Sequence, residues 1–241
     1  MNSPRAAHFI FETLGYGIGF RLYLIARRKE GDFLPTEART WLVVAAILGA
    51  ALGSKLLFWL EDPARSWQHM GDLGYLVAGK TIVGGLLGGT IAVEWTKIRL
   101  GVHRRTGDLY AIPMALGIAI GRIGCFFGGL ADDTYGIQSN VPWAVDFGDG
   151  IPRHPTQLYE TAAMLILSAW LYWRGSTSTL SRPEGAQFRF FLTAYLAWRL
   201  SIDFLKPGVH FAGLTPIQWT AAAALTWYIT HPIHQLETAH G

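Results

Sequence analysis

The sequence predicts an all-α polytopic membrane protein with about seven transmembrane helices, forming a single integral membrane domain over residues 1–241. Its composition is the first reason: 51% of the residues are hydrophobic and 15% are charged, whereas about a quarter are charged in ordinary soluble domains. The second reason is a series of apolar runs, each close to the ~20 residues that cross a ~30 Å hydrocarbon layer. The third is an uneven distribution of lysine and arginine between these runs.

Each apolar run predicts one helix. The first run has no basic segment of the signal-peptide kind before it and no small-residue cleavage pattern after it, so we expect this helix to be retained. The predicted helices lie at about residues 8–26, 41–60, 74–96, 109–130, 155–173, 188–205 and 214–231.

The basic residues between the runs predict the orientation. The segments after the first, third and fifth runs are rich in basic residues, which are Arg27, Arg28, Lys29 and Arg39, then Lys97, Arg99, Arg104 and Arg105, then Arg174 and Arg182. The segments after the second, fourth and sixth runs carry only Arg65, Arg153 and Lys206. Because cytoplasmic loops hold the excess of lysine and arginine, we predict the N-terminus outside and the C-terminus inside. The net charge of +3 then faces anionic lipid and needs no nucleic-acid partner.

Several charged residues share one depth in this topology, near the outer face. Arg122 is the clearest, because it stands within the apolar run Gly121–Gly129, where an ionisable group is costly and usually functional. The net charge of these residues is positive, which suits the binding of a phosphate group. Arg122 and Arg199 can each bind phosphate oxygens with a planar guanidinium. The set comprises Lys55, Lys80, Arg122, Arg153, His154, Glu160, Arg199 and Asp203.

Structural roles are the alternative for some of these residues. Lys55 and Lys80 could be anchors whose ammonium groups reach the membrane surface. Arg199 and Asp203, four residues apart, could form an ion pair inside the helix bundle. The glycines at 84–89 indicate close helix packing, and they also permit a lipid or a loop to approach the backbone.

Other residues also have a structural alternative. His154 could be a surface residue at a helix start, and Tyr159 could be an aromatic anchor at the membrane interface. Cys125 is the single cysteine, so we expect no intrachain disulfide and a small packing side chain at that position. The sequence shows no grouped metal ligands, no phosphate-binding glycine loop and no Gly-x-Ser-x-Gly motif, so we expect no metal or other cofactor.

Four motifs, in this order, resemble the prolipoprotein diacylglyceryl transferase family, and the resemblance extends from about Lys80 to Lys206. The family's seven-helix arrangement, with the N-terminus outside, agrees with the topology predicted from the charges. The motifs are Asp108-Leu109-Tyr110-Ala111-Ile112-Pro113, Gly121-Arg122-Ile123-Gly124, Tyr135-Gly136 and Arg153-His154-Pro155-Thr156-Gln157-Leu158-Tyr159-Glu160.

The resemblance implies a multi-pass enzyme of the bacterial plasma (inner) membrane. Such an enzyme moves the diacylglyceryl group of phosphatidylglycerol to the lipobox cysteine of a secreted precursor and releases glycerol 1-phosphate. Its partners would be phosphatidylglycerol, prolipoprotein signal peptides and membrane lipids. Arg122, Arg199 and His154 would be catalytic, with His154 a candidate proton acceptor. The residues expected to bind substrate are Lys80, Arg122, Tyr159, Glu160, Arg199 and Asp203.

The chain also departs from the family pattern. The departures are Val83 for His, Cys125 for Asn, Gly128 for a second Asn with no clear acid beyond it, Asp203 for Glu and Lys206 for Arg. Asp132 or Asp133 could replace the missing acid. Three hypotheses therefore remain: a lipoprotein diacylglyceryl transferase, a divergent relative that uses the same phospholipid site with another acceptor, and a noncatalytic lipid-binding or transport protein.

Overall fold

The computed structural model describes residues 4–31, 34–177 and 183–231, and these are almost entirely helical. This confirms the all-α prediction. The β structure among them is one short antiparallel pair, β1 (Val145–Asp146) with β2 (Pro152–Arg153), in which Val145 faces Arg153. The chain divides into two compact units: Met1–Gly31 with Arg105–Pro207 and His231–Gly241, and Asp32–Arg104 with Gly208–Thr230.

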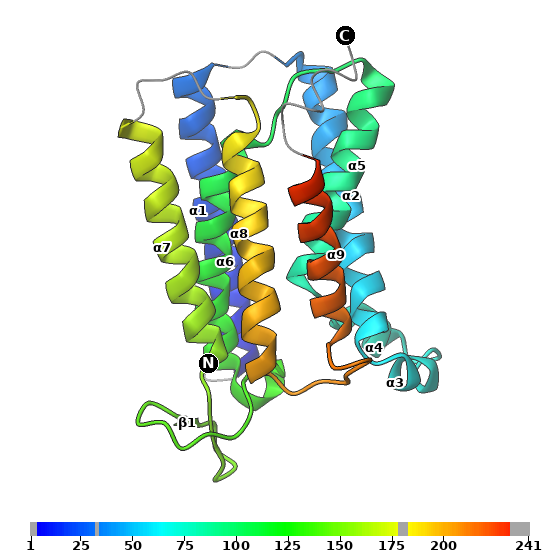
Figure 1. Ribbon diagram of the computed structural model, residues 1–241, viewed down its shortest axis with the longest axis vertical. Coiled ribbons are helices and arrows are strands. Elements are labelled where there is room, and N and C mark those ends of the chain that lie inside the picture. Colours follow the sequence, from blue (N-terminus) through cyan, green and yellow to red (C-terminus); the bar gives the residue numbers. More distant parts are fainter. Residues whose placement is uncertain (1–3, 32–33, 178–182, 232–241) are drawn as a thin grey trace. The chain divides into compact units, whose positions relative to one another are not determined.

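The first unit is a bundle of four long helices that lie side by side (Figure 1). Its elements are α1 (Pro4–Glu30), α6 (Asp108–Gly128), the short 3₁₀ helix η1 (Gly129–Asp132), α7 (Thr156–Thr177), α8 (Ala186–Ile202) and the 3₁₀ helix η2 (Asp203–Leu205). Small residues bring α6 close to its neighbours: Ala111, Ala115 and Ala119 are at most 1% exposed. Such residues allow helix backbones to approach closely in a membrane.

In this unit, α1 and α7 run in one direction and α6 and α8 run in the opposite direction. Gly15 of α1 lies against Gly117 of α6, and Gly19, one turn later, lies against Pro113, one turn earlier. At the other end of α6, the Asp108 carboxylate accepts hydrogen bonds from the backbone N–H groups of Gly185 (2.8 Å) and Phe188 (2.9 Å) at the start of α8. The starts of α1 and α7 and the ends of α6 and α8 therefore share one end of the bundle.

The second unit contains α2 (Thr36–Glu61), α3 (Pro63–Gln68), α4 (Leu73–Ala78), α5 (Ile82–Leu100) and α9 (Pro216–Thr230). Glycines set the contact between α2 and α5: a Cβ added at Gly84 or Gly88 would overlap the carbonyl oxygens of Gly53 and Gly49. This confirms the close packing predicted from the glycine run. At the start of α9, Thr215 and Gln218 form a reciprocal capping box, with bonds of 2.9 and 3.1 Å.

The prediction of one continuous helix over 74–96 is wrong, because the chain is interrupted between α4 and α5. Gly79 is extended at this point, and the Thr81 hydroxyl caps α5 by accepting a hydrogen bond from Gly84 N–H. The Lys55 ammonium donates to the carbonyl oxygens of Val77 and Gly79 and so satisfies the end of α4. The other six predicted helices coincide with α1, α2, α6, α7, α8 and α9.

Three segments among the described residues are long and apolar enough to cross a membrane: Ala6–Lys29, Thr36–Glu61 and Asp108–Asp132. The distribution of side chains supports the same environment. Large apolar residues face outward, for example Ile166 at 70% exposure and Ile229 at 75%, whereas Glu160 is 0% exposed. An apolar exterior around buried charges is the arrangement expected of a helix bundle in lipid.

Candidate active site

Polar side chains gather at the end of the first unit where α6 and α8 finish and α7 begins. Helix α6 ends at Gly128, and the next residue, Gly129, has a φ of 57° in the left-handed region that favours glycine. The Thr134 hydroxyl then donates to Asp132 (2.7 Å), and the Thr156 hydroxyl donates to the Thr134 carbonyl (2.8 Å). These bonds fasten the segment that follows α6 to the first turn of α7.

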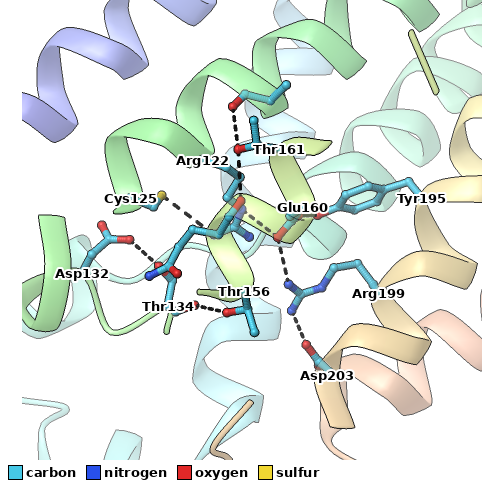
Figure 2. A network of polar contacts seen from close by, with 12 residues as sticks. Arg122, Cys125, Asp132, Thr134, Thr156, Glu160, Thr161, Tyr195, Arg199 and Asp203 are labelled. Carbon is cyan, nitrogen blue, oxygen red and sulfur yellow. Dashed lines mark hydrogen bonds and ion pairs between the residues drawn. The ribbon is translucent and has the colours of Figure 1, made fainter. Parts of the chain in front are cut away.

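Glu160 is the centre of the cluster (Figure 2). One of its carboxylate oxygens lies 2.8 Å from Arg122 Nε and 3.5 Å from Arg199 Nη1. The Tyr195 hydroxyl donates to the other oxygen at 2.8 Å. Arg199 also pairs with Asp203, at 2.6 Å. The charges that the sequence placed at one depth on α6, α7 and α8 are therefore in direct contact.

Both carboxylates hold guanidiniums in place. Glu160 and Asp203 each engage an arginine directly, and their role in substrate binding stays a prediction. Two arginines and two carboxylates balance, and Lys206 supplies a further positive charge that interacts with all four. Desolvation and the neighbouring guanidiniums lower the pKa of Lys206, which follows η2, to about 7. The cluster therefore carries a net positive charge when Lys206 is protonated.

Unpaired polar atoms lie in the same cluster. Among the described residues, neither Arg199 Nε nor either amide atom of Gln157 has a hydrogen-bond partner, although Gln157 is 0% exposed. Gln157 stands three residues before Glu160 on α7, which places the two on neighbouring positions of one helix face. Leaving buried groups unpaired costs about 1–3 kcal/mol each. A ligand with acceptor oxygens would satisfy these donors.

His154 and Tyr159 form a second polar group at the start of α7. His154 Nδ1 lies 3.1 Å from the Tyr159 hydroxyl, which also accepts a hydrogen bond from Trp143 Nε1 at 2.6 Å. The backbone of His154 pairs with Gly136 and Ile137. A Cβ at Gly136 would lie 2.7 Å from His154 Cβ, so glycine is needed there. The imidazole is thus held at a fixed position with Nε2 directed away from its tyrosine partner.

Arg153, next to His154, is engaged within its own loop. It forms two 2.7 Å bonds to Asp149 and lies over the Tyr135 ring, 4.8 Å from the centroid. The paired guanidinium lowers the pKa of the exposed Asp149 carboxyl. This geometry indicates that Arg153 stabilises the loop.

Lys80 belongs to the second unit, together with Lys55 and Val83. Lys80 is exposed and Val83 is 1% exposed. The role of Lys80 in substrate binding stays a prediction. For Lys55, the bonds to the end of α4 supply a structural role that agrees with the alternative considered from the sequence.

Two parts of the site were not expected from the sequence. Tyr195 could have been found, because positions 195, 199 and 203 repeat every four residues and share one face of α8. The second part is the group of His8, Cys125 and Asp132, which no spacing links. We expected no grouped metal ligands, but the structure places these three side chains together.

The fold and the site define a helical membrane protein with a buried cluster of arginines and carboxylates at one end of a helix bundle. The chain belongs to the prolipoprotein diacylglyceryl transferase family, whose model matches residues 10–231. No solved structure matches it.

Three relatives illustrate the similarity, each a phosphatidylglycerol–prolipoprotein diacylglyceryl transferase. The protein from Bordetella bronchiseptica is 34% identical, over 88% of this chain and 82% of its own length. That from Nitrosomonas europaea is 32% identical, over 86% and 78%. That from Pseudomonas aeruginosa (strain LESB58) is 30% identical, over 79% and 72%.

Proposed function

We propose that this protein transfers the diacylglyceryl group of phosphatidylglycerol to the lipobox cysteine thiol of secreted prolipoproteins, with release of glycerol 1-phosphate. The observation that carries the proposal is the contact of Arg122 and Arg199 through Glu160, within a chain that belongs to this family. In a substrate with one phosphate and two acyl chains, the phosphate needs cationic partners inside an otherwise apolar bundle.

The chemistry explains why two fixed guanidiniums are useful. The acceptor sulfur attacks the glyceryl carbon, the carbon–oxygen bond to phosphate breaks, and a phosphate monoester leaves with an additional negative charge. Donors already oriented toward the departing group stabilise that charge without reorganising. Arg122 and Arg199, held by Glu160 and Asp203, are the binding and catalytic residues we propose, with Lys206 beside them.

A proton acceptor is needed for the thiol, and we propose His154 for this role. Its neighbour Tyr159 orients the ring through Nδ1 and leaves Nε2 for the acceptor. Imidazole is suited to the task because its ordinary pKa lies near neutrality. Tyr159 therefore acts here as a positioning residue for the base, and Lys80 remains a proposed contact for the lipid headgroup.

We also propose that the protein is one multi-pass domain of the bacterial inner membrane, with seven spans, the N-terminus outside and the C-terminus inside. The alternating directions of α1, α6, α7 and α8 support this topology, because they bring the charged helix ends to a common level. A reporter fused after Gly241 should report a cytoplasmic location, and one fused near Asp132 the opposite side. Reporters that score on the same side would contradict the topology.

A divergent relative with another acceptor is the second candidate. It is favoured by Val83, which is buried and apolar where the family has an imidazole, and by Cys125 in place of an asparagine. Cys125 contacts Arg122, with 3.8 Å between Sγ and Nη1, and the contacts of Glu160 with Arg122 and Arg199 are formed with cysteine at this position. The phospholipid site is therefore retained in both candidates, and only the acceptor differs.

One assay separates these candidates. Purified full-length protein is incubated with phosphatidylglycerol and a lipobox peptide, and both glycerol 1-phosphate and the mass of the modified peptide are measured. We expect equal amounts of the two products, and none with a peptide whose lipobox cysteine is replaced by serine. Release of glycerol phosphate without peptide modification would favour another acceptor, and no release would refute the proposed transfer.

A further inference from the structure

His8, Cys125 and Asp132 bring an imidazole, a thiol and a carboxylate together from α1, α6 and η1. Their ligand atoms all lie within 4.8 Å of one another. His8 Nδ1 is 2.8 Å from Asp132 Oδ1. The histidine side chain is 30% exposed, the aspartate side chain is 13% exposed, and Cys125 is buried. The group therefore has a protected sulfur on one side and an accessible ring on the other.

We propose that these three residues bind a zinc-type divalent cation that keeps its fourth position open for the acceptor thiol. The inference rests on the proposed function for the identity of that fourth ligand. Zinc is bound by cysteine, histidine and carboxylate side chains, and catalytic sites use three protein ligands with one open position. A thiolate and an imidazole together disfavour calcium and magnesium, which prefer oxygen ligands.

The local structure is arranged to bring the ligands close. A Cβ at Gly124 would lie 2.8 Å from Phe11 Cβ and 3.2 Å from the His8 carbonyl oxygen, so glycine lets the start of α1 rest on α6. A Cβ at Gly128 would lie 2.9 Å from Asp132 Cβ, so glycine also lets η1 fold back toward Cys125. A larger residue at 128 would push Asp132 away from the sulfur.

The carboxylate is oriented as a metal ligand needs. Thr134 donates to Asp132 Oδ2 at 2.7 Å, while Oδ1 faces His8. One oxygen is thus held by an outer hydrogen bond and the other is directed at the cluster, an arrangement that positions ligands in metal sites. Ligand atoms around tetrahedral zinc are roughly 3–4 Å apart. The three ligand atoms, all within 4.8 Å of one another and with 2.8 Å between His8 Nδ1 and Asp132 Oδ1, lie close to that spacing.

The charges around the cluster also allow a cation. Arg122 Nη1 lies 3.8 Å from Cys125 Sγ, so a positive charge already contacts the sulfur. The charge of Arg122 is balanced by Glu160, at 2.8 Å. The two positive charges of a divalent ion are cancelled by the Cys125 thiolate and the Asp132 carboxylate. The bound ion and its ligands therefore add no net positive charge beside the Arg122 guanidinium.

Such an ion gives the acceptor thiol a route to its reactive form. A thiol that binds the metal loses its proton to water or to the His154 imidazole and becomes a thiolate. The sulfur then forms a bond to the glyceryl carbon, the carbon–oxygen bond to phosphate breaks, and the electron pair stays on the phosphate oxygen. No atom is oxidised or reduced. The resulting thioether is a weaker metal ligand than the thiolate, so the product can leave.

The test uses the full chain in detergent and Co²⁺ as a spectroscopic probe of the zinc site. Since Cys125 is the single cysteine, any thiolate-to-cobalt charge-transfer absorption must come from that residue. We expect about one metal ion per chain and this absorption in the wild type. Cys125→Ser should abolish the absorption, and His8→Ala or Asp132→Asn should weaken cobalt binding at least about tenfold.

The matched control is Asp133→Asn. Asp133 is adjacent to Asp132 but its carboxylate interacts with Tyr135, and asparagine tolerates its left-handed φ of 53°. This variant should keep the wild-type cobalt spectrum. A wild type without the absorption at saturating Co²⁺, or a metal affinity that the three ligand substitutions leave unchanged, would overturn the site.

A second arm tests the role of the ion. Adding a lipobox peptide should shift the cobalt spectrum, and a serine peptide should not. Chelation should lower diacylglyceryl transfer at least about tenfold, and added Zn²⁺ should restore it. Undiminished transfer by metal-free protein would overturn the activation of the thiol while leaving the proposed function intact. Metal binding with the expected ligand dependence but no transfer would support the site and refute the proposed function.

Discussion

Replacing Glu160 by glutamine tests how the buried cluster is held together. Glu160 is 0% exposed and contacts Arg122 and Arg199 at 2.8 and 3.5 Å. Glutamine keeps the size of the side chain and an acceptor for Tyr195, but it leaves two guanidiniums facing each other with one counter-charge removed. Removing one partner of a buried ion pair costs about 3–5 kcal/mol. Because Arg199 retains Asp203, we expect about 3 kcal/mol, roughly a hundredfold in the unfolding equilibrium.

Thermal unfolding in detergent measures this loss. For a chain of this size, about 3 kcal/mol corresponds to a fall of roughly 6–12 °C in the unfolding midpoint. Glu94→Gln is the matched control, because Glu94 pairs with Lys97 at 3.0 Å but its side chain is 61% exposed. The Lys97 side chain is 5% exposed, but the Glu94 carboxylate stays in solvent, so we expect a smaller loss than in Glu160→Gln. Equal midpoints for Glu160→Gln and the wild type would refute the view that Glu160 holds the arginines.

The same variant tests whether the arginines receive phosphate. Glycerol 1-phosphate at a hundred times its dissociation constant stabilises a protein by about 2.7 kcal/mol. We expect a larger shift of the midpoint in Glu160→Gln than in the wild type, because the ligand's phosphate can supply the charge that the substitution removes. Identical shifts in both proteins would place the ligand elsewhere.

The remaining predictions concern single side chains of the site. Arg122→Lys keeps the charge but loses the planar guanidinium that can bind two oxygens, so phosphatidylglycerol turnover should fall at least about tenfold in folded protein. The same fall is expected in Arg199→Ala. Unchanged turnover in both variants would contradict the proposed headgroup site. His154→Gln should lower thioether formation by about 10²–10⁴ without changing phospholipid binding, and a normal rate would show that another group is the base. Because the pKa of Lys206 is lowered to about 7, Lys206 is charged below pH 7 and neutral above it, so headgroup affinity should fall about tenfold from pH 6 to pH 8. Lys206→Arg should abolish that pH dependence, and a pH dependence that persists would assign it to another group.

Local signals in the sequence predict most of the helices and the central charges. Arg122 and Arg199 stand out because an ionisable residue in an apolar run is rare, and the alternation of helix directions brings them to one level. The interruption at Gly79 could not be seen in the same way, since 74–96 is apolar throughout most of its length. It depends on Lys55, a residue of another helix that satisfies the end of α4.

Contacts between distant segments explain what the sequence could not predict. His8 is more than a hundred residues from Cys125, and their proximity depends on Gly124 letting α1 approach α6. No periodicity records that approach. Similarly, Glu160 stands on α7, and its contacts with Arg122 of α6 and Arg199 of α8 are known only from the distances between these helices.

The unpaired donors of the cluster define where a phosphate would bind. Arg122 Nε and both Nη atoms of Arg199 face carboxylates, so an anion that entered would have to use the groups that remain. Among the described residues, these include Arg199 Nε and the Gln157 amide, both buried and without a hydrogen-bond partner. Since each unpaired buried group costs about 1–3 kcal/mol, a phosphate that accepts from both regains that free energy on binding. In the proposed headgroup site, the carboxylates would therefore fix the direction of the guanidiniums, and the unpaired donors would give the anion its affinity.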